Sequence, residues 1–227
     1  MPKRTRVGTG GIVFHVMNRA IRGTTLFESA DDYSAFERIL AESVTWSGVR
    51  LLAYCLMPNH WHLVVWPAHD EQLPRFLHRL TMTHAIRWST ARGTRGRGAV
   101  YQSRYRSVPV ETSTHFLTVC RYVERNALRA NLVARAEHWQ WSSLWQRCSS
   151  CDAIPLGRWP ILPPSSWVEI VNRPHTESEL AALRGAFHRG TPLGSEKWGA
   201  EIADRLGLQH SRRPSGRPRT NNTGCGF

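Results

Sequence analysis

Residues 54–67 read YCLMPNHWHLVVWP and have the pattern of a β-hairpin. Two apolar runs flank Pro58-Asn59, a dipeptide typical of a turn. Because side chains alternate across a strand, His60 and His62 project from one face of the returning strand and Trp61 projects from the other. The two imidazoles could converge on a metal ion, or they could be two strand histidines that face solvent. A third ligand from elsewhere in the chain would favour the metal.

Strand and helix patterns alternate on both sides of this hairpin. Hydrophobic periodicity predicts strands over 12–18, 49–56, 60–66 and 103–111, and helices over 30–46, 73–91 and about 113–132. The order β-α-β-β-α-β-α predicts a ferredoxin-like α+β fold, in which a four-stranded antiparallel sheet carries two helices on one face. We expect the last helix at the margin of the sheet.

Composition divides the chain into four parts. Residues 1–146 hold the sheet, and the prolines after Trp145 predict an irregular linker over 147–175. A short helical extension over 176–209 follows, with helices expected over 177–188 and 195–206. These two helices could form a helix-turn-helix reader, or they could cover the sheet. The arginine-rich tail over 210–227 is expected to be disordered.

The charge balance indicates a polyanionic partner. Thirty Lys and Arg residues face 17 Asp and Glu residues, for a net charge of +13. No acidic residue lies between Gln72 and Val110, whereas arginines are frequent there. Since the planar guanidinium suits phosphate, nucleic acid is the partner that we predict. The alternative is a basic surface that serves only solubility.

Two further features bear on the compartment. No apolar run approaches the roughly 18 residues of a membrane span, and the basic start is followed by an apolar run too short and broken for a signal peptide. Five cysteines do not suggest a disulfide framework, and the single pair Cys148–Cys151 is a weak indication of zinc. We therefore expect a cytoplasmic protein without a membrane partner.

The third helix offers a possible partner for the histidines. Tyr122 and Asn126 are four residues apart, so they lie one turn above the other, and Arg121, Arg125 and Arg129 form an adjacent basic stripe. A phosphodiester could dock there, with the Asn126 carbonyl oxygen on a metal and the Tyr122 oxygen facing phosphorus. The alternative is a half-buried tyrosine beside a hydrogen-bonded asparagine.

A family resemblance covers these motifs. The segments AYCLMPNHWHLVV, residues 53–65, and RYVERNALRANLVARAEHWQWSSL, residues 121–144, resemble the single-tyrosine HUH transposases, and among them the bacterial REP-associated tyrosine transposases. The resemblance extends from about residue 7 to residue 144. RGTPLGSEKW, residues 189–198, and GRPR, residues 216–219, are similar to elements of the same group.

The resemblance implies an HUH endonuclease palm and a mechanism. It implies Tyr122 as the nucleophile, His60 and His62 as catalytic metal ligands, Asn126 as the third ligand, and Mg²⁺ or Mn²⁺ as the ion. It further implies metal-dependent cleavage and transfer of single-stranded DNA at REP-like hairpins, through a covalent 5′-phosphotyrosine. Many members have Asn-Pro where this chain has Asn126-Ala127, and since alanine favours a continuing helix, we expect the site to be kept.

The remaining expectations concern DNA, assembly and rival functions. We expect the protein to be a monomer or homodimer, associated with the nucleoid. One rival is a non-catalytic hairpin-binding protein, and another is a metal-dependent hydrolase that uses water. The set of His60, His62, Tyr122 and Asn126 favours the transposase over both. The expected DNA-contacting residues are Asn18, Arg19, Arg22, Arg92, Arg95, Arg97, Arg104, Arg106, Arg125, Arg129, Arg217 and Arg219.

Overall fold

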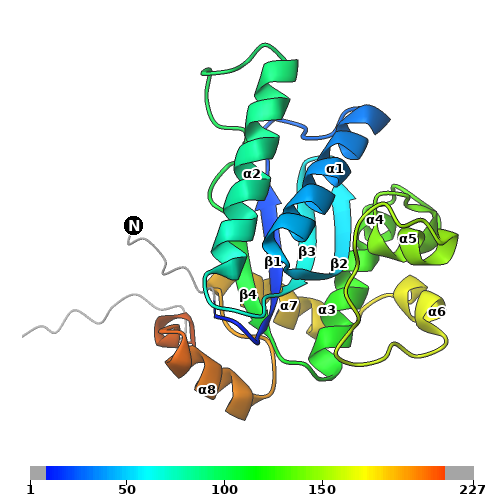
Figure 1. Ribbon diagram of the computed structural model, residues 1–227. Helices are drawn as coiled ribbons and strands as arrows, with labels where there is room; N and C mark the ends of the chain where they lie inside the picture. Colours follow the sequence, from blue (N-terminus) through cyan, green and yellow to red (C-terminus); the bar gives the residue numbers. More distant parts are fainter. Residues whose placement is uncertain (1–8, 213–227) are drawn as a thin grey trace, which may run out of the picture.

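The computed structural model describes residues 9–212 and contains one four-stranded sheet (Figure 1). The strands have the spatial order β2-β3-β1-β4, and each neighbouring pair is antiparallel. This is the ferredoxin-like α+β arrangement, so the predicted fold class is confirmed. The strands are β1 (Val13–Arg19), β2 (Arg50–Met57), β3 (His60–Trp66) and β4 (Arg106–Val110).

Two long helices cover the first face of the sheet (Figure 1). Helix α1 (Ala30–Ser47) starts at a capping box in which Ser29 accepts a hydrogen bond from the Asp32 amide, and it ends at Gly48 in the left-handed region, φ 67°. Helix α2 (Gln72–Ala91) packs beside it. Alternate side chains of the strands, among them Trp61, are buried against these helices in an apolar core.

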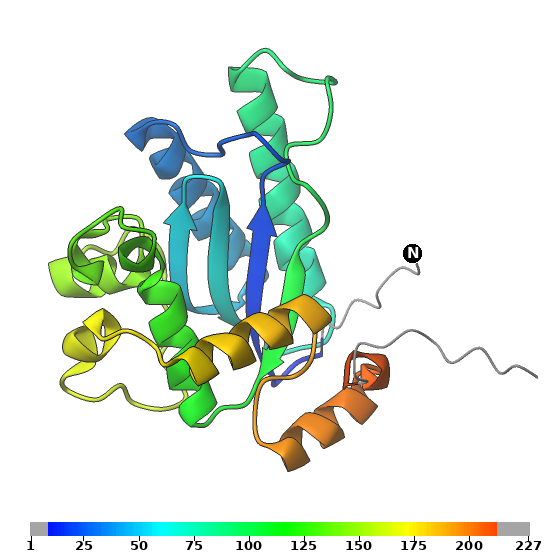
Figure 2. The same ribbon diagram turned by 180° about the vertical axis from the view of Figure 1, so that it is seen from behind.

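The second face of the sheet is covered by shorter pieces (Figure 2). Helix α3 (Thr114–Glu124) lies across this face and buries Phe116, Cys120 and Val123 against the outward-facing side chains of β2 and β3. It is therefore not at the margin, where we expected it. Helix α7 (Glu177–Arg189) also crosses this face, and its Leu183 joins the same core.

Helix α3 ends earlier than predicted. The expected helix over 113–132 breaks at Arg125, and a single turn, α4 (Asn126–Arg129), follows. The chain remains helical through Ala127, but Asn131 adopts a left-handed conformation, φ 56°, that stops the helix. The fourth strand is also shorter than its predicted range of 103–111.

The segment 147–175 is largely irregular, as expected, but it is packed against the domain and is not a free linker. It follows η1 (Ala136–His138) and part of α5 (Ser143–Ser149), and it contains α6 (Trp167–Asn172). The buried carboxylate of Glu124 accepts hydrogen bonds from Ser143 Oγ at 2.6 Å and Trp167 Nε1 at 2.7 Å. It also pairs with Arg147 Nη1 at 2.5 Å. One carboxylate thus joins α3 to α5 and α6.

After α7 the chain returns to β4, the outer strand at one edge of the sheet. Leu193 forms a parallel bridge with Val110 of β4, and α8 (Glu196–Arg205) follows it. Residues 210–212, expected as the start of a disordered tail, belong to the 3-10 turn η2 (Gln209–Arg212), in which Ser211 is buried. The rest of that tail, with Arg217 and Arg219, lies outside the described residues. Within residues 9–212, no helix is both long and apolar enough to cross a membrane.

Candidate active site

His60 and His62 lie on the second face of the sheet, at the start of β3. Their ring centroids are 5.0 Å apart, and Trp61 between them points into the opposite core. Nδ1 of His60 donates to Oδ1 of Asn59 at 2.7 Å, and Nδ1 of His62 lies 3.0 Å from Nε2 of His15 on β1. Among the described contacts, the Nε2 atom of each ring has no hydrogen-bond partner. Both rings thus have one nitrogen held by the protein and one remaining for a ligand.

Burial keeps this histidine cluster neutral. Desolvation lowers the pKa of His60 to about 4, with the charges of Arg19 and Arg129 adding to the effect. Desolvation likewise places the pKa of His62 well below its ordinary value, and lowers that of His15 to about 3. Since a metal binds the neutral imidazole, the cluster is in the ligating form at neutral pH.

Tyr122 on α3 faces the same cluster. Its ring centroid is 5.8 Å from that of His62 and 5.9 Å from that of His15, both edge to face. The guanidinium carbon of Arg129 lies 5.3 Å from the centroid of the tyrosine ring. In the part of the chain that the structure describes, the Tyr122 hydroxyl makes no hydrogen bond. The tyrosine ring therefore lies beside two imidazoles and a guanidinium, and its hydroxyl has no partner among the described residues.

Asn126 is fully buried and is the fourth residue of the candidate site, after His60, His62 and Tyr122. Its Oδ1 accepts a hydrogen bond from Nη2 of Arg129 at 2.9 Å, and its Nδ2 has no partner. A carboxamide oxygen has two lone pairs, so one remains for a second interaction. Two neutral imidazoles and an amide oxygen are donors that a divalent metal accepts. The residues present therefore fit a metal, although no group of three His, Cys, Asp or Glu residues within 9–212 is arranged as a metal site.

Comparison with known proteins places this chain within a family. A model of the IS200-like transposases matches residues 10–126, just over half of the 227-residue chain, a range that includes both histidines, Tyr122 and Asn126. The chain belongs to the IS200-like transposase family. It is thus a DNA-processing enzyme. No relative was found among the curated proteins.

Solved structures agree with the fold. The transposase is 16% identical to a REP-associated tyrosine transposase bound to a REP hairpin, with a TM-score of 0.53, over 71% of this chain and 94% of that one. A putative transposase from Deinococcus radiodurans R1 is 20% identical, with a TM-score of 0.37, over 54% of this chain and 96% of that one. The first likeness supports the ferredoxin-like architecture, and the second is too low to support an argument.

Three residues of the site were not predicted from the sequence. His15 contacts His62, Phe187 of α7 packs on His15 with ring centroids 4.3 Å apart, and the ring centroid of His175 lies 6.0 Å from that of Tyr122. Strand alternation places His15 on the same face as Val13 and could have indicated it once the pairing of β1 with β3 was known. Nothing in the sequence around Phe187 or His175 indicates that they contact the site.

The predicted DNA-contacting arginines within residues 9–212 fall into two groups. Arg92 is ion-paired with Asp32, at 2.7 Å, and lies over the Trp88 ring, so it joins α2 to the start of α1. Arg129 is engaged by Asn126, and Nη1 of Arg125 is buried without a hydrogen-bond partner. The arginines that are exposed and therefore open to a polyanion are Arg19, Arg22, Arg95, Arg97, Arg104 and Arg106.

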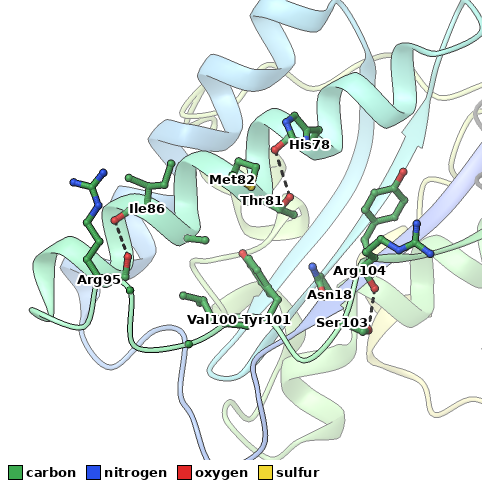
Figure 3. Close-up of a pocket in the computed structure, with 16 residues that line it drawn as sticks. Asn18, His78, Thr81, Met82, Ile86, Arg95, Val100, Tyr101, Ser103 and Arg104 are labelled. Carbon is green, nitrogen blue, oxygen red and sulfur yellow. Dashed lines mark hydrogen bonds between the residues drawn. The ribbon is translucent and has the colours of Figure 1, made fainter. Parts of the chain in front are cut away.

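A cavity of about 500 Å³ lies between α2 and the segment 95–105 (Figure 3). Asn18, Arg95 and Arg104 line it, together with the exposed apolar side chains of Met82 and Ile86. No acidic residue is among the lining residues. The cavity thus combines apolar walls with positive charge, a chemistry that suits an unpaired nucleotide.

Proposed function

We propose that this transposase is a metal-dependent endonuclease and strand transferase for single-stranded DNA, with Tyr122 as the nucleophile. The observation that carries the proposal is the 5.8 Å separation between the ring centroids of Tyr122 and His62, on one face of the sheet. A phosphate seated beside the two rings, at their open edge, would contact both groups. The pair comes from one chain, so a monomer has a complete set of these side chains.

The chemistry is a transesterification. The Tyr122 oxygen attacks phosphorus and loses its proton to water, the phosphorus–O3′ bond breaks, and the 3′ oxygen takes a proton from water and leaves as a hydroxyl. The product is a 5′-phosphotyrosine that keeps the energy of the broken ester, so a later 3′-hydroxyl can reverse the step and join strands. The nearby guanidinium of Arg129 favours the negative charge that develops on the phenol oxygen.

His60, His62 and the carbonyl oxygen of Asn126 would hold Mg²⁺ or Mn²⁺, which polarises the non-bridging phosphate oxygens when bound. The protein prepares this site in two ways. Each imidazole is kept neutral by burial, and each is oriented by a contact at Nδ1. Oriented neutral ligands lose little freedom when an ion arrives.

The substrate that we propose is a DNA hairpin with an unpaired flank. The structural neighbour with a TM-score of 0.53 is bound to a REP hairpin, and the exposed arginines of this chain suit a phosphate backbone. The cavity beside α2 would take one unpaired base against Met82 and Ile86, with Arg95 and Arg104 near its phosphate.

A labelled-oligonucleotide assay tests the proposal. Hairpin DNA labelled at its 5′ end, and in a parallel reaction at its 3′ end, is incubated with protein and Mn²⁺, then separated under denaturing conditions. The wild type should give a protein–DNA adduct and a free 3′-hydroxyl fragment, and Tyr122→Phe should give neither while still binding the hairpin. Binding without an adduct by the wild type would indicate a non-catalytic hairpin-binding protein. Cleavage by Tyr122→Phe would indicate a hydrolase that uses water.

A further inference from the structure

We propose that His15 is a positioning residue that fixes the ring of His62 in the tautomer whose Nε2 lone pair faces the metal. This inference rests on the proposed metal role of His62. It concerns a residue of β1, whereas the expected ligands come from β3 and α4.

The contact is short and buried. Nε2 of His15 and Nδ1 of His62 are 3.0 Å apart, and the two residues are 1% and 4% exposed. In the register of β1 and β3, His15 is paired with Val64 and His62 with Met17, so the two histidines are diagonal neighbours on the same face. Water has little access to either ring, so each nitrogen depends on the protein for its partner.

The direction of this hydrogen bond decides which nitrogen of His62 can bind a metal. A neutral imidazole carries one proton, so one nitrogen donates and the other accepts. If Nδ1 of His62 donates to His15, then Nε2 of His62 has its lone pair free. If His15 donates instead, the proton of His62 is on Nε2 and blocks the metal. A His15 ring with an unprotonated Nε2 therefore selects the ligating form of His62.

The C-terminal extension holds His15 in place. Phe187 of α7 meets the His15 ring with centroids 4.3 Å apart and an interplanar angle of 62°, and its ring centroid is 6.3 Å from that of His62. With β1 on one side and Phe187 on the other, the His15 ring has little freedom to turn away. The extension thus contributes to the order of the histidine cluster from more than one hundred residues away in the sequence.

Binding of Mn²⁺ to the full chain, measured by calorimetry without DNA, tests the role of His15. His15→Phe keeps a ring against Phe187 but removes the acceptor, and we expect a loss of about 10- to 100-fold in Mn²⁺ affinity. His15→Gln places an amide oxygen near the position of Nε2 and should restore most of the affinity. An unchanged affinity in His15→Phe would overturn the inference while leaving the proposed function intact. A wild type that binds no Mn²⁺ would overturn both.

The tautomer can be read directly in the wild type, which removes any dependence on folding of the variants. Long-range ¹⁵N–¹H correlation spectra of the metal-free protein, with ring signals assigned by substitution, should show the His62 proton on Nδ1. A His62 proton on Nε2 would contradict the inference whatever the affinities are.

Substitution in α7 tests the contribution of the extension. Phe187→Ala should weaken Mn²⁺ binding and mix the two His62 tautomers, because the His15 ring loses its cover. Arg184→Ala, at an exposed position of the same helix, is the matched control and should change neither measurement. If Phe187→Ala and Arg184→Ala gave the same Mn²⁺ affinity and the same His62 tautomer, Phe187 would have no part in holding His15.

Discussion

Each face of the sheet carries a buried histidine beside a tyrosine, but the two pairs differ in their hydrogen bonds. On the first face, Nδ1 of His84 is 2.7 Å from the Tyr101 hydroxyl, which also accepts from Nε1 of Trp61 at 3.2 Å. On the second face, His62 and Tyr122 meet only through their ring edges, and no hydrogen bond of the Tyr122 hydroxyl occurs within residues 9–212. A satisfied hydroxyl serves stability, whereas an unengaged one beside polar groups can serve chemistry.

The faces also differ in how their helices are held. Helices α1 and α2 lie on an apolar core and are joined by the partly exposed ion pair of Arg92 with Asp32. Helix α3 also has apolar contacts with the sheet, but in addition it carries the fully buried carboxylate of Glu124. A polar anchor sets one geometry, because its partners must all be aligned to satisfy it. The face with the candidate chemistry is thus the face with the more specific anchor.

The two tyrosines provide the sharpest contrast in activity. Tyr122→Phe should lower formation of the DNA adduct by about 1,000-fold or more, since the nucleophile is lost. Tyr101→Phe should leave the adduct yield within a few-fold and instead cost about 1–3 kcal/mol of stability, because His84 and Trp61 lose a buried partner. Adduct yield on denaturing gels and chemical denaturation measure the two effects. An equal loss of adduct in Tyr122→Phe and Tyr101→Phe would contradict the assignment of Tyr122 as nucleophile and Tyr101 as a structural residue.

Metal removal should distinguish the role of His62, on the second face of the sheet, from that of His84, on the first face. Chelation should lower cleavage by at least about 100-fold, and added Mn²⁺ should restore it. His62→Ala should show the same loss without rescue by Mn²⁺, whereas His84→Gln on the opposite face should still respond to the ion. Cleavage that persists in the chelator would argue against any metal in the reaction.

The anchor at Glu124 can be broken by one substitution. Glu124→Ala leaves Arg147 without its buried partner, and we expect a loss of about 3–5 kcal/mol in the free energy of unfolding. Glu124→Gln keeps an acceptor oxygen for one of the two donors, Ser143 Oγ or Trp167 Nε1, and should lose less. Urea denaturation of both variants gives the comparison, and a loss below about 1 kcal/mol for Glu124→Ala would show that apolar contacts alone hold α3.

The smallest effect concerns Glu37 on α1. Burial raises the pKa of Glu37 to about 7, against a partial opposing effect of the hydrogen bond from Tyr54. Because the folded state holds this proton more tightly, stability is lost as the pH rises from about 4.5 to about 7. Glu37→Gln should therefore raise the unfolding free energy by about 1–3 kcal/mol at pH 8, with no gain at pH 4.5. A gain of equal size at both pH values would exclude this cause.

The order of strands and helices in the sheet domain was predictable, because the hairpin and the amphipathic helices are local patterns. Alternation in β3 likewise placed His60 and His62 on one face. The position of α3 was not predictable, since the connection after β4 does not set which part of the sheet the helix covers. Arg92 was expected on DNA, but its partner Asp32 lies 60 residues away and could not be identified from local sequence.

The contacts of His15 and Phe187 show the same limit. A single histidine in an apolar strand has no signal of its own, and its partner is 47 residues away. Phe187 lies in a helix that its periodicity predicted, but which surface that helix covers depends on the whole fold. Local chemistry can thus indicate the candidate nucleophile and ligands, whereas the groups that would orient them require coordinates.

Both outer strands of the sheet are bonded along part of their length to the chain's own later segments. On β4, the amide of Leu193 donates to the Pro109 carbonyl and the Glu111 amide donates to the Leu193 carbonyl. On β2, the Leu56 amide donates to Trp141 and the Leu51 carbonyl accepts from Gly157. A second copy of the chain would find few unpaired groups there for strand addition, which protects the sheet against edge-to-edge aggregation.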